Sequence, residues 1–392
     1  MKYLIGALWI VVCLALMAEV PFCSAQTYSV LYSFKAGPHG TYPGAGVTVD
    51  AKRQALYGTT ENDGRFAAGA VFALDLHGQR VLHSFSGNPG DGAHPFGNGS
   101  PLLANGALFS ATQGGGIYDG TCETHGCGVV FKIDQFGTET VLYQFTGGTD
   151  GWGPEGTLAS DPSGNVYGVT RAGGNFNAGA IFKLDSSGHE TVLHSFAYNS
   201  PDGASPLGGV LRDNHGNLYG TTYLGGTWDG GTIFKVDTSG NLSIVYNFGD
   251  KTGDAGNPDG RMTPDGKGNL YGIASAGGIL GLGAVFKVSS TGTETVLHSF
   301  GAIPDAQTPI FNGVALDPSG VLYGVTHHGG AFGLGAIFKI DAAGNETVIH
   351  SFSGPDGEYP YGGLARDPQG SLYGTTSQGG AYGGGVIFRI KP

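Results

Sequence analysis

The sequence predicts an all-β protein, a seven-bladed β-propeller of four-stranded antiparallel blades, and three observations support this prediction. A unit of about 52 residues recurs seven times along the chain. Each unit holds four short runs rich in β-branched and aromatic residues, separated by glycine, asparagine and aspartate. No stretch after residue 25 keeps the 3.6-residue period of an amphipathic helix. A four-stranded repeat of this length is typical of a propeller blade.

Three signatures mark the unit, always in the same order. The first is Val-Leu-His-Ser-Phe and its variants, which end at Phe34, Phe85, Phe145, Phe196, Phe248, Phe300 and Phe352. The second is Leu-Tyr-Gly-Thr-Thr, with its aromatic at Tyr57, Phe109, Tyr167, Tyr219, Tyr271, Tyr323 and Tyr373. The third is Gly-Ala-Ile-Phe-Lys-Ile-Asp, with its phenylalanine at Phe72, Phe131, Phe182, Phe234, Phe286, Phe338 and Phe388.

Tight turns join the strands within each unit. Segments such as Asp161 to Gly164 and Asp213 to Gly216 connect the first two strands, and Asp237 to Gly240 connects the last two. Aspartate can accept a hydrogen bond from the backbone ahead of it, and glycine can adopt a positive φ. Each unit is therefore expected to be an antiparallel meander.

The two ends of the chain predict how the ring closes. The repeats begin with a lone fourth strand at 27–34 and end after a third strand at 386–390. The N-terminal strand is therefore expected to complete the last blade beside residues 362–390.

These motifs resemble the GloVer tandem-repeat family of exported bacterial proteins. The match lies in Leu218-Tyr-Gly-Thr-Thr222, Gly225-Gly226 and Gly231-Thr-Ile-Phe-Lys235, which recur together over residues 27–390. The resemblance implies export and a repeat fold, and it brings no established activity. Members often carry a C-terminal surface anchor, whereas this sequence ends at Lys391-Pro392.

Residues 1–25 have the anatomy of a signal peptide, and residues 26–392 are expected to form one propeller domain. Lys2 precedes an apolar run from Leu4 to Met17, and small residues precede a cleavage point after Ala25. The alternative is an uncleaved anchor helix, but Glu19 and Pro21 interrupt the apolar run. We expect a protein that is secreted, periplasmic or at the cell surface, with no membrane span after cleavage.

The net charge of −12 argues against a nucleic acid or an anionic membrane as partner. The partners left open are an extracellular polysaccharide or another envelope protein, and we expect a monomer. Cleavage would leave Cys122 and Cys127, which should form a disulfide in an oxidising compartment. The alternative is a metal site that includes His125, but this spacing does not match known zinc motifs.

Two repeated features fall on the face where strand four meets the next strand one. An Asp-Gly-x-x-Pro motif recurs there, with His39 in the first copy and aspartate at Asp91, Asp150, Asp202, Asp254, Asp305 and Asp356. These aspartates could bind cations or sugar hydroxyls, or they could simply initiate a tight turn, which is the interpretation we favour.

The second feature is an aromatic residue two positions after a Gly-Gly pair. It recurs at Phe66, Tyr118, Phe176, Trp228, Phe332 and Tyr382, with Leu280 in the fifth copy. Exposed aromatics around a mouth would stack on sugar rings, whereas buried ones would fill gaps between blades. We favour burial, with Trp228 as the strongest candidate for an exposed ligand contact.

Other polar residues suggest metal sites or structural roles. Asp250, Asp254, Asn257 and Asp259 form an oxygen-rich set that calcium would accept, but it does not match the twelve-residue calcium loop, and turn chemistry is the interpretation we favour. His327-His328 is a weaker metal candidate. The recurrent Lys of strand three and His of strand four, including Lys235 and His83, are expected to form a polar edge on each blade. Apart from calcium, no cofactor is expected.

Catalysis would need a site that differs from its copies, because one acid, base or nucleophile must occupy one environment. The positions that break the repeat are the Cys122 to Cys127 insertion, Glu61 with Asp63, Glu155 with Arg171, and His327-His328; no catalytic motif accompanies them. The leading hypothesis is therefore an exported, non-catalytic binding or scaffold protein. The alternatives are a polysaccharide hydrolase or lyase with carboxylates at the central mouth, and a purely structural surface protein.

Overall fold

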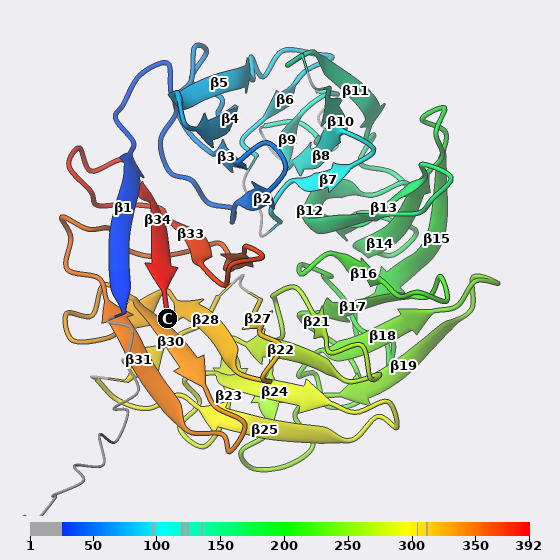
Figure 1. Cartoon of the computed structure of the whole chain (residues 1–392). Coiled ribbons are helices and arrows are strands. Elements are labelled where there is room, and N and C mark those ends of the chain that lie inside the picture. Colours follow the sequence, from blue (N-terminus) through cyan, green and yellow to red (C-terminus); the bar gives the residue numbers. More distant parts are fainter. Residues whose placement is uncertain are drawn as a thin grey trace, which may run out of the picture.

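The seven predicted blades are present and form a closed ring around a central axis (Figure 1). The computed structural model describes residues 26–95, 99–118, 122, 125–134, 136–303, 305–310 and 313–392. The predicted signal peptide at 1–25 lies outside them. Every regular element among the described residues is a strand, so this part of the chain contains no helix that could cross a membrane.

Each blade is a four-stranded antiparallel sheet that runs from the axis outward. Blade one contains β2 (Thr48–Asp50), β3 (Ala55–Thr60), β4 (Ala70–Asp75) and β5 (Gly78–Ser84). Blade two contains β7 (Leu102–Ala104), β8 (Ala107–Thr112), β10 (Val129–Ile133) and β11 (Glu139–Gln144). Blade three contains β12 (Trp152–Ser160), β13 (Val166–Ala172), β14 (Asn177–Leu184) and β15 (Glu190–Ala197). Blade four contains β16 (Val210–Arg212), β17 (Leu218–Thr222), β18 (Thr232–Val236) and β19 (Leu242–Asn247).

The remaining blades follow the same plan. Blade five contains β21 (Thr263–Pro264), β22 (Leu270–Ala274), β24 (Ala284–Val288) and β25 (Glu294–Ser299). Blade six contains β27 (Ala315–Leu316), β28 (Leu322–Thr326), β30 (Ala336–Ile340) and β31 (Glu346–Ser351). Blade seven contains β32 (Ala365–Arg366), β33 (Leu372–Thr376), β34 (Val386–Lys391) and β1 (Thr27–Ser33). Two-residue ribbons pair β6 (Gly92–Ala93) with β9 (Gly114–Gly115), β20 (Ala255–Gly256) with β23 (Ala276–Gly277), and β26 (Ala306–Gln307) with β29 (His328–Gly329).

The ring closes as the sequence predicts. β1 is the outer strand of blade seven and pairs antiparallel with β34, from Thr27 opposite Lys391 to Ser33 opposite Val386. Two segments at opposite ends of the described chain thus complete one sheet (Figure 1).

Pairs of phenylalanines hold neighbouring blades together. The strand-four phenylalanine of one blade packs on the strand-three phenylalanine of the next, with ring centroids 4.9–5.5 Å apart at all seven junctions. At the junction of blades three and four, for example, Phe196 contacts Phe234, and both side chains are fully buried. Burial of each such ring contributes about 1.5–3 kcal/mol to the stability of the fold. The repeated pair is therefore the main apolar contact between neighbouring blades.

The glycine of Leu-Tyr-Gly-Thr-Thr makes room for that core. Gly220 lies opposite Phe234 in the sheet, and a Cβ at Gly220 would lie 2.5 Å from the ring's Cζ. The equivalent glycines 58, 168, 272, 324 and 374 are equally close to their phenylalanines, and blade two carries Ser110 instead. The motif is therefore a packing requirement of the blade.

Near the axis, the segments leading into the innermost strands meet backbone to backbone. A Cβ on Gly156 would lie 2.1 Å from the Gly209 nitrogen, and one on Gly362 would lie 2.0 Å from the Gly46 nitrogen. Only glycine permits this approach.

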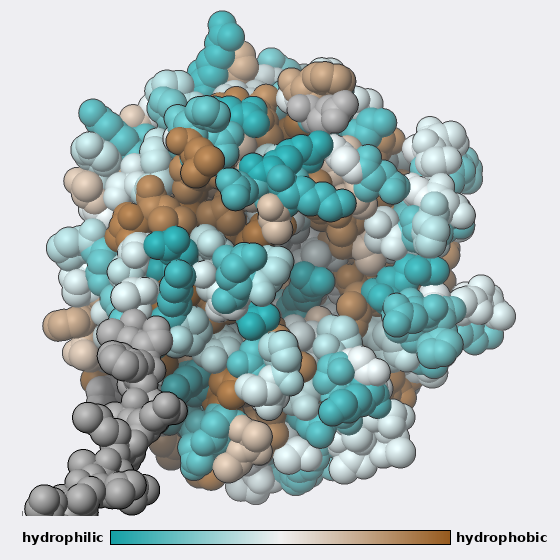
Figure 2. All heavy atoms as spheres, in the orientation of Figure 1, coloured by the Kyte–Doolittle hydropathy of each residue, from teal (hydrophilic) through white to brown (hydrophobic). Residues whose placement is uncertain are grey.

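The surface in Figure 2 is largely polar, with apolar side chains gathered beside β1 and blade one. There, a groove of about 540 Å³ between the last and first blades is lined in part by Leu31, Leu56, Leu74 and Leu76.

Candidate functional site

The loops after strand two and after strand four lie at the same end of each blade, and two positions in them define the mouth of the propeller. One is the residue before the proline of the Asp-Gly-x-x-Pro motif, and the other is the residue directly after the Leu-Tyr-Gly-Thr-Thr motif of strand two. Paired in that order, they are Tyr42 and Glu61, His94 and Gln113, Gly153 and Arg171, Ser205 and Tyr223, Asn257 and Ser275, Thr308 and His327, and Tyr359 and Ser377.

The backbone at these positions is constant although the side chains differ. The residue before the proline has a φ between 48° and 61° in all seven copies. Its carbonyl accepts a hydrogen bond from the partner's amide, as from Glu61 to Tyr42 at 2.9 Å and from Ser377 to Tyr359 at 3.0 Å. A positive φ is costly for most residues other than glycine. The fold therefore fixes the backbone here and leaves the choice of side chain open.

Side chains from different blades converge at this mouth. Tyr361 follows the proline that leads into blade seven, and burial raises the pKa of its hydroxyl, with further contributions from the charges of Glu61 and Asp259. Those carboxyls come from blade one and from the connection into blade five. Residues from three parts of the ring are thus close enough to influence the pKa of one hydroxyl, that of Tyr361.

One part of the mouth forms a pocket of about 250 Å³ across blades one to three. We call it the mouth pocket; its lining residues are Glu61, Asn62, His94, Gln113, Gly114, His125, Gly126, Trp152 and Arg171. Burial raises the pKa of the Glu61 carboxyl. Burial, aided by the charge of His125, lowers the pKa of His94. Both groups are therefore biased toward their neutral forms, which can donate as well as accept hydrogen bonds.

The disulfide shapes one wall of the mouth pocket. Cys122 and Cys127 are bonded as predicted, with their Cα atoms 5.2 Å apart. His125 lies inside this short loop, where its carbonyl accepts a hydrogen bond from the Gly115 amide at 2.6 Å. Its ring packs edge-on against His94, with centroids 5.1 Å apart.

Arg171 and Trp152 form the opposite wall. The Arg171 guanidinium lies over the indole, 4.8 Å from its centroid. A Cβ at Gly153 would lie 3.1 Å from the Arg171 Nε, so glycine at this position lets the arginine cross. Stacking on tryptophan fixes the orientation of the guanidinium, whose N–H groups are hydrogen-bond donors.

The repeated aspartates serve mainly to close the loops after strand four. Asp91 accepts hydrogen bonds from the Ser86 amide at 2.7 Å and from the Ser86 hydroxyl. Asp150, Asp254, Asp305 and Asp356 accept amide hydrogen bonds in the same way. This geometry fits the turn-building interpretation, and a ligand-binding role for these residues stays a prediction.

The Gly-Gly aromatics are exposed. The exposed fraction is 52 % for Phe66, 47 % for Tyr118, 62 % for Phe176, 58 % for Trp228, 63 % for Phe332 and 62 % for Tyr382. Our preferred interpretation, that they fill gaps between blades, is therefore wrong, because the paired phenylalanines already occupy those gaps. Ligand binding by the aromatics stays a prediction.

The proposed calcium residues do not come together as a ligand set. Asp254 accepts hydrogen bonds from the Gly249 and Asp250 amides. The side chain of Asn257 turns away and donates to the Tyr223 carbonyl at 2.8 Å. Among the described residues, the groups of three or more His, Cys, Asp or Glu ligand atoms within 4.8 Å of one another lie elsewhere.

His327 also has a different environment from the one expected of a metal ligand. It packs against Tyr359 and Tyr361, with centroid distances of 5.0 and 4.7 Å. Burial, with a contribution from the charge of His328, lowers its pKa to about 4. His327 thus belongs to an aromatic part of the mouth.

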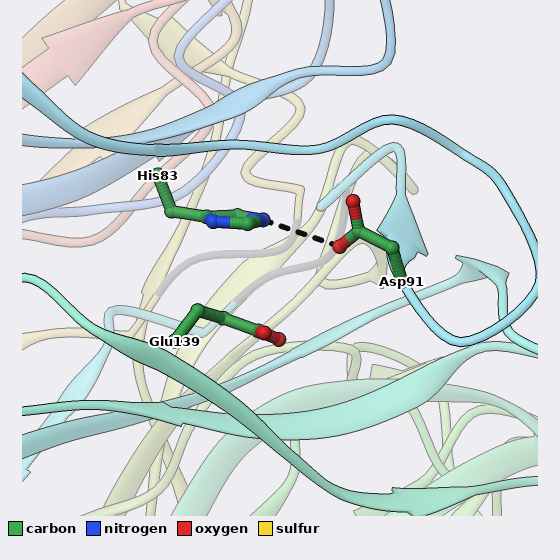
Figure 3. Close-up of side chains that lie close together, drawn as sticks. All are labelled: His83, Asp91 and Glu139. Carbon is green, nitrogen blue, oxygen red and sulfur yellow. Dashed lines mark hydrogen bonds and ion pairs between the residues drawn. The ribbon is translucent and has the colours of Figure 1, made fainter.

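The strand-four histidines lie partly exposed on the outermost strand of their blades, where each comes close to an aspartate of the following loop. His83 Nε2 lies 3.1 Å from Asp91 Oδ1, and Glu139 from strand four of the next blade points at the same spot (Figure 3). Every junction places three equivalent positions together: the residue two before the strand-four phenylalanine, the Asp of the loop, and the residue six before the next strand-four phenylalanine. We call these three positions the junction cluster.

The residues that occupy the junction cluster differ from one junction to the next. They are Tyr32, His39 and Gln79; His83, Asp91 and Glu139; Tyr143, Asp150 and Glu190; His194, Asp202 and Leu242; Tyr246, Asp254 and Glu294; His298, Asp305 and Glu346; and His350, Asp356 and Tyr28. Burial, with the nearby aspartate, raises the pKa of Glu190 and Glu346 to about 7. The glutamates of these clusters were not predicted from the sequence as site residues, because the residues they meet come from the preceding blade.

Comparison with known proteins supports the fold and the family. No curated protein matches the sequence. The extracellular domain of a candidate one-component system of B. thetaiotaomicron superimposes with a TM-score of 0.58 at 9 % identity, over 93 % of this chain and 39 % of that one. The corresponding domain of a candidate hybrid two-component system from the same organism gives 0.57 at 11 % identity, over 93 % and 41 %. This chain thus spans well under half of either protein.

A candidate 6-phosphogluconolactonase of Bacteroides fragilis gives a TM-score of 0.52 at 17 % identity, over 83 % of this chain and 89 % of that one. At these identities the likeness concerns the fold alone. The model of the Gloeobacter/Verrucomicrobia repeat matches residues 22–198, 80–279 and 250–392, which together span the propeller. The chain therefore belongs to the Gloeobacter/Verrucomicrobia repeat family.

Proposed function

We propose that this protein is an exported, non-catalytic binding module whose mouth pocket holds one unit of an extracellular carbohydrate. The observation that carries the proposal is the concentration of Glu61, His94, His125, Trp152 and Arg171 in one pocket of a ring that is otherwise built from similar repeats. A binding site for one ligand needs such a departure from symmetry.

The chemistry of the mouth pocket suits a sugar. The carboxyl, imidazole and guanidinium groups can pair with hydroxyls or with a sugar carboxylate, and an indole supplies an apolar wall. The volume of about 250 Å³ lies just below that of pockets for drug-sized ligands, about 300–1,000 Å³. We therefore expect one ring of a longer chain to occupy it, with the exposed aromatics of the same face available to neighbouring units.

The test is a binding screen of the purified protein against soluble neutral and uronate-containing glycans, followed by calorimetry. Arg171→Gln and Trp152→Ala should each weaken binding of a hit at least tenfold. Tyr223→Ala changes the position equivalent to Arg171 in blade four and should leave affinity unchanged. If Arg171→Gln and Tyr223→Ala behave alike, or if no glycan binds, the proposal fails.

A second candidate function is a carbohydrate-cleaving enzyme. It is favoured by the raised pKa of Glu61, since burial that shifts a carboxyl toward its protonated form suits it to the role of a general acid. Turnover of a bound glycan that disappears in Glu61→Gln while affinity is retained would replace the non-catalytic proposal. Binding without turnover would reject the enzyme.

A further inference from the structure

We propose that two of the seven junction clusters are binding sites for a divalent transition metal of the zinc class. The sites are His83 with Asp91 and Glu139, and His298 with Asp305 and Glu346. In each, one ligand atom per residue lies within 4.8 Å of the other two. This inference concerns the sides of the ring and does not depend on the proposed carbohydrate site.

The residue types select the metal. One imidazole nitrogen and two carboxylates form a ligand set that zinc accepts, and three protein ligands leave a fourth position for water. Calcium and magnesium prefer oxygen ligands alone, so a histidine in the set argues against them.

The His–Asp distances in the two complete clusters are compatible with a shared ion. Zinc bonds of about 2.0–2.1 Å in a tetrahedron place neighbouring ligand atoms about 3.3 Å apart, and the His–Asp separations are 3.1 and 3.6 Å. The 3.1 Å between His83 and Asp91 is also a hydrogen-bond distance, as are the 2.6 Å between His194 and Asp202 and the 2.9 Å between His350 and Asp356. What distinguishes the two junctions from these copies is therefore the glutamate.

The complete clusters also carry polar atoms that have no hydrogen-bond partner among the described residues. These are Oε1 of Glu139, Oε1 of Glu346 and Nε2 of His298, all of them buried. Neither glutamate has a lysine or arginine ion pair in the described part of the chain. Oε1 of Glu190 and of Glu294 is also buried without a hydrogen-bond partner within the described ranges, but the other carboxylate oxygen of Glu294 pairs with Lys251 at 3.4 Å, and both of these junctions hold tyrosine in place of histidine. In the complete clusters, a divalent cation would be coordinated by the lone pairs of these buried nitrogen and oxygen atoms and would balance two adjacent carboxylates.

The sites would be accessible to an ion. The side chains of His83 and Asp91 are 23 % and 20 % exposed, and those of His298 and Asp305 are 19 % and 20 % exposed. His298, Asp305 and Glu346 also line a surface hollow of about 660 Å³. A bound ion would join strand four of one blade to strand four of the next.

The test is to load the purified protein with zinc, remove the excess by dialysis and measure zinc per chain by mass spectrometry. Two zinc ions per chain are expected. His83→Tyr combined with His298→Tyr should remove both, and tyrosine already occupies this position at Tyr143 and Tyr246, so the variant should fold.

The matched control is His194→Tyr combined with His350→Tyr, which changes the two junctions that have His and Asp but lack glutamate. It should retain both ions. Equal zinc content in the two double variants, or no retained zinc in the unmodified protein, would overturn the proposal. So would anomalous X-ray peaks located at other histidines, such as His94 with His125.

A gain of function provides a second test that does not depend on a loss of binding. Leu242→Glu completes the cluster of His194 and Asp202 and should raise the content from two zinc ions to three. A content that stays at two, with the variant folded, would show that the glutamate is not the deciding ligand.

Discussion

At the junctions between blades each repeat contributes the same pair of phenylalanines, whereas at the mouth each repeat contributes different side chains on the same backbone. The first region is buried and identical around the ring, as in Phe196 against Phe234. The second carries tyrosine, histidine, glycine, serine, asparagine or threonine at one position of unchanged, positive φ.

This contrast separates construction from recognition. A residue that every blade needs for packing recurs seven times, and a residue that contacts one ligand does not. The junction clusters fall between the two cases, because their positions recur but only two of the seven hold the complete His, Asp and Glu set. The predictions below change one side of this contrast at a time.

The largest effect is expected from Phe234→Ala in blade four. The side chain is fully buried, and its removal leaves a cavity against Phe196, which should cost about 3–5 kcal/mol of unfolding free energy. Urea denaturation measures this directly. A loss below about 1 kcal/mol would mean that the phenylalanine pairs are not the main interaction between blades.

The next largest effect on stability is expected from removal of the disulfide. This bond lies where the constant blade scaffold meets the variable residues of the mouth. Cys122→Ala with Cys127→Ala should lower the unfolding free energy by about 2 kcal/mol, from loop-closure entropy. It should also weaken any ligand of the mouth pocket, because His125 lies within the loop. The unmodified protein in reducing agent is the control that retains both sulfurs, and an unchanged affinity in both samples would show that the loop does not shape the pocket.

The repeat pattern predicted the scaffold because packing imposes the same residues on every blade. The signature phenylalanines, the glycine of Leu-Tyr-Gly-Thr-Thr and the closing strand all follow from a local pattern with a fixed period. The four strands expected in each repeat appear, for example, as β16 to β19 in blade four.

The sites were harder to predict, because each combines residues from different blades. Glu61 and Arg171 stood out as breaks in the repeat, but their meeting with His94, His125 and Trp152 depends on how three blades are arranged. Glu139 lies near His83 only because strand four of one blade faces strand four of the next. Comparing the repeats position by position would have revealed the variable pairs at the mouth, but not which of them form a pocket.

A smaller effect is expected from Glu190→Gln, at a junction outside the two proposed metal sites. Burial and the charge of Asp150 raise the Glu190 pKa to about 7, and Tyr143 faces the same aspartate. The folded protein therefore retains a proton between about pH 4.5 and 7 that the unfolded chain releases, and this contribution to stability is lost as the pH rises through 7.

Glu190→Gln should make the melting temperature less dependent on pH between 5 and 8, and higher than that of the unmodified protein at pH 8. Glutamine already fills the equivalent position at Gln79, so the substitution suits the site. Melting curves in a chelator measure the effect. A pH dependence identical to that of the unmodified protein would show that Glu190 is ionised in the folded state.

The smallest effect on stability is expected from Trp228→Ala, in the same blade as Phe234. The tryptophan is 58 % exposed, and exposed substitutions usually change stability by no more than about 0.5 kcal/mol. Denaturation of this variant beside Phe234→Ala compares an exposed and a buried aromatic of one repeat. A loss of several kcal/mol would restore the view that the Gly-Gly aromatics fill the gaps between blades. A negligible loss, together with weaker binding of a long glycan but unchanged binding of a short one, would place Trp228 on an extended carbohydrate surface around the mouth.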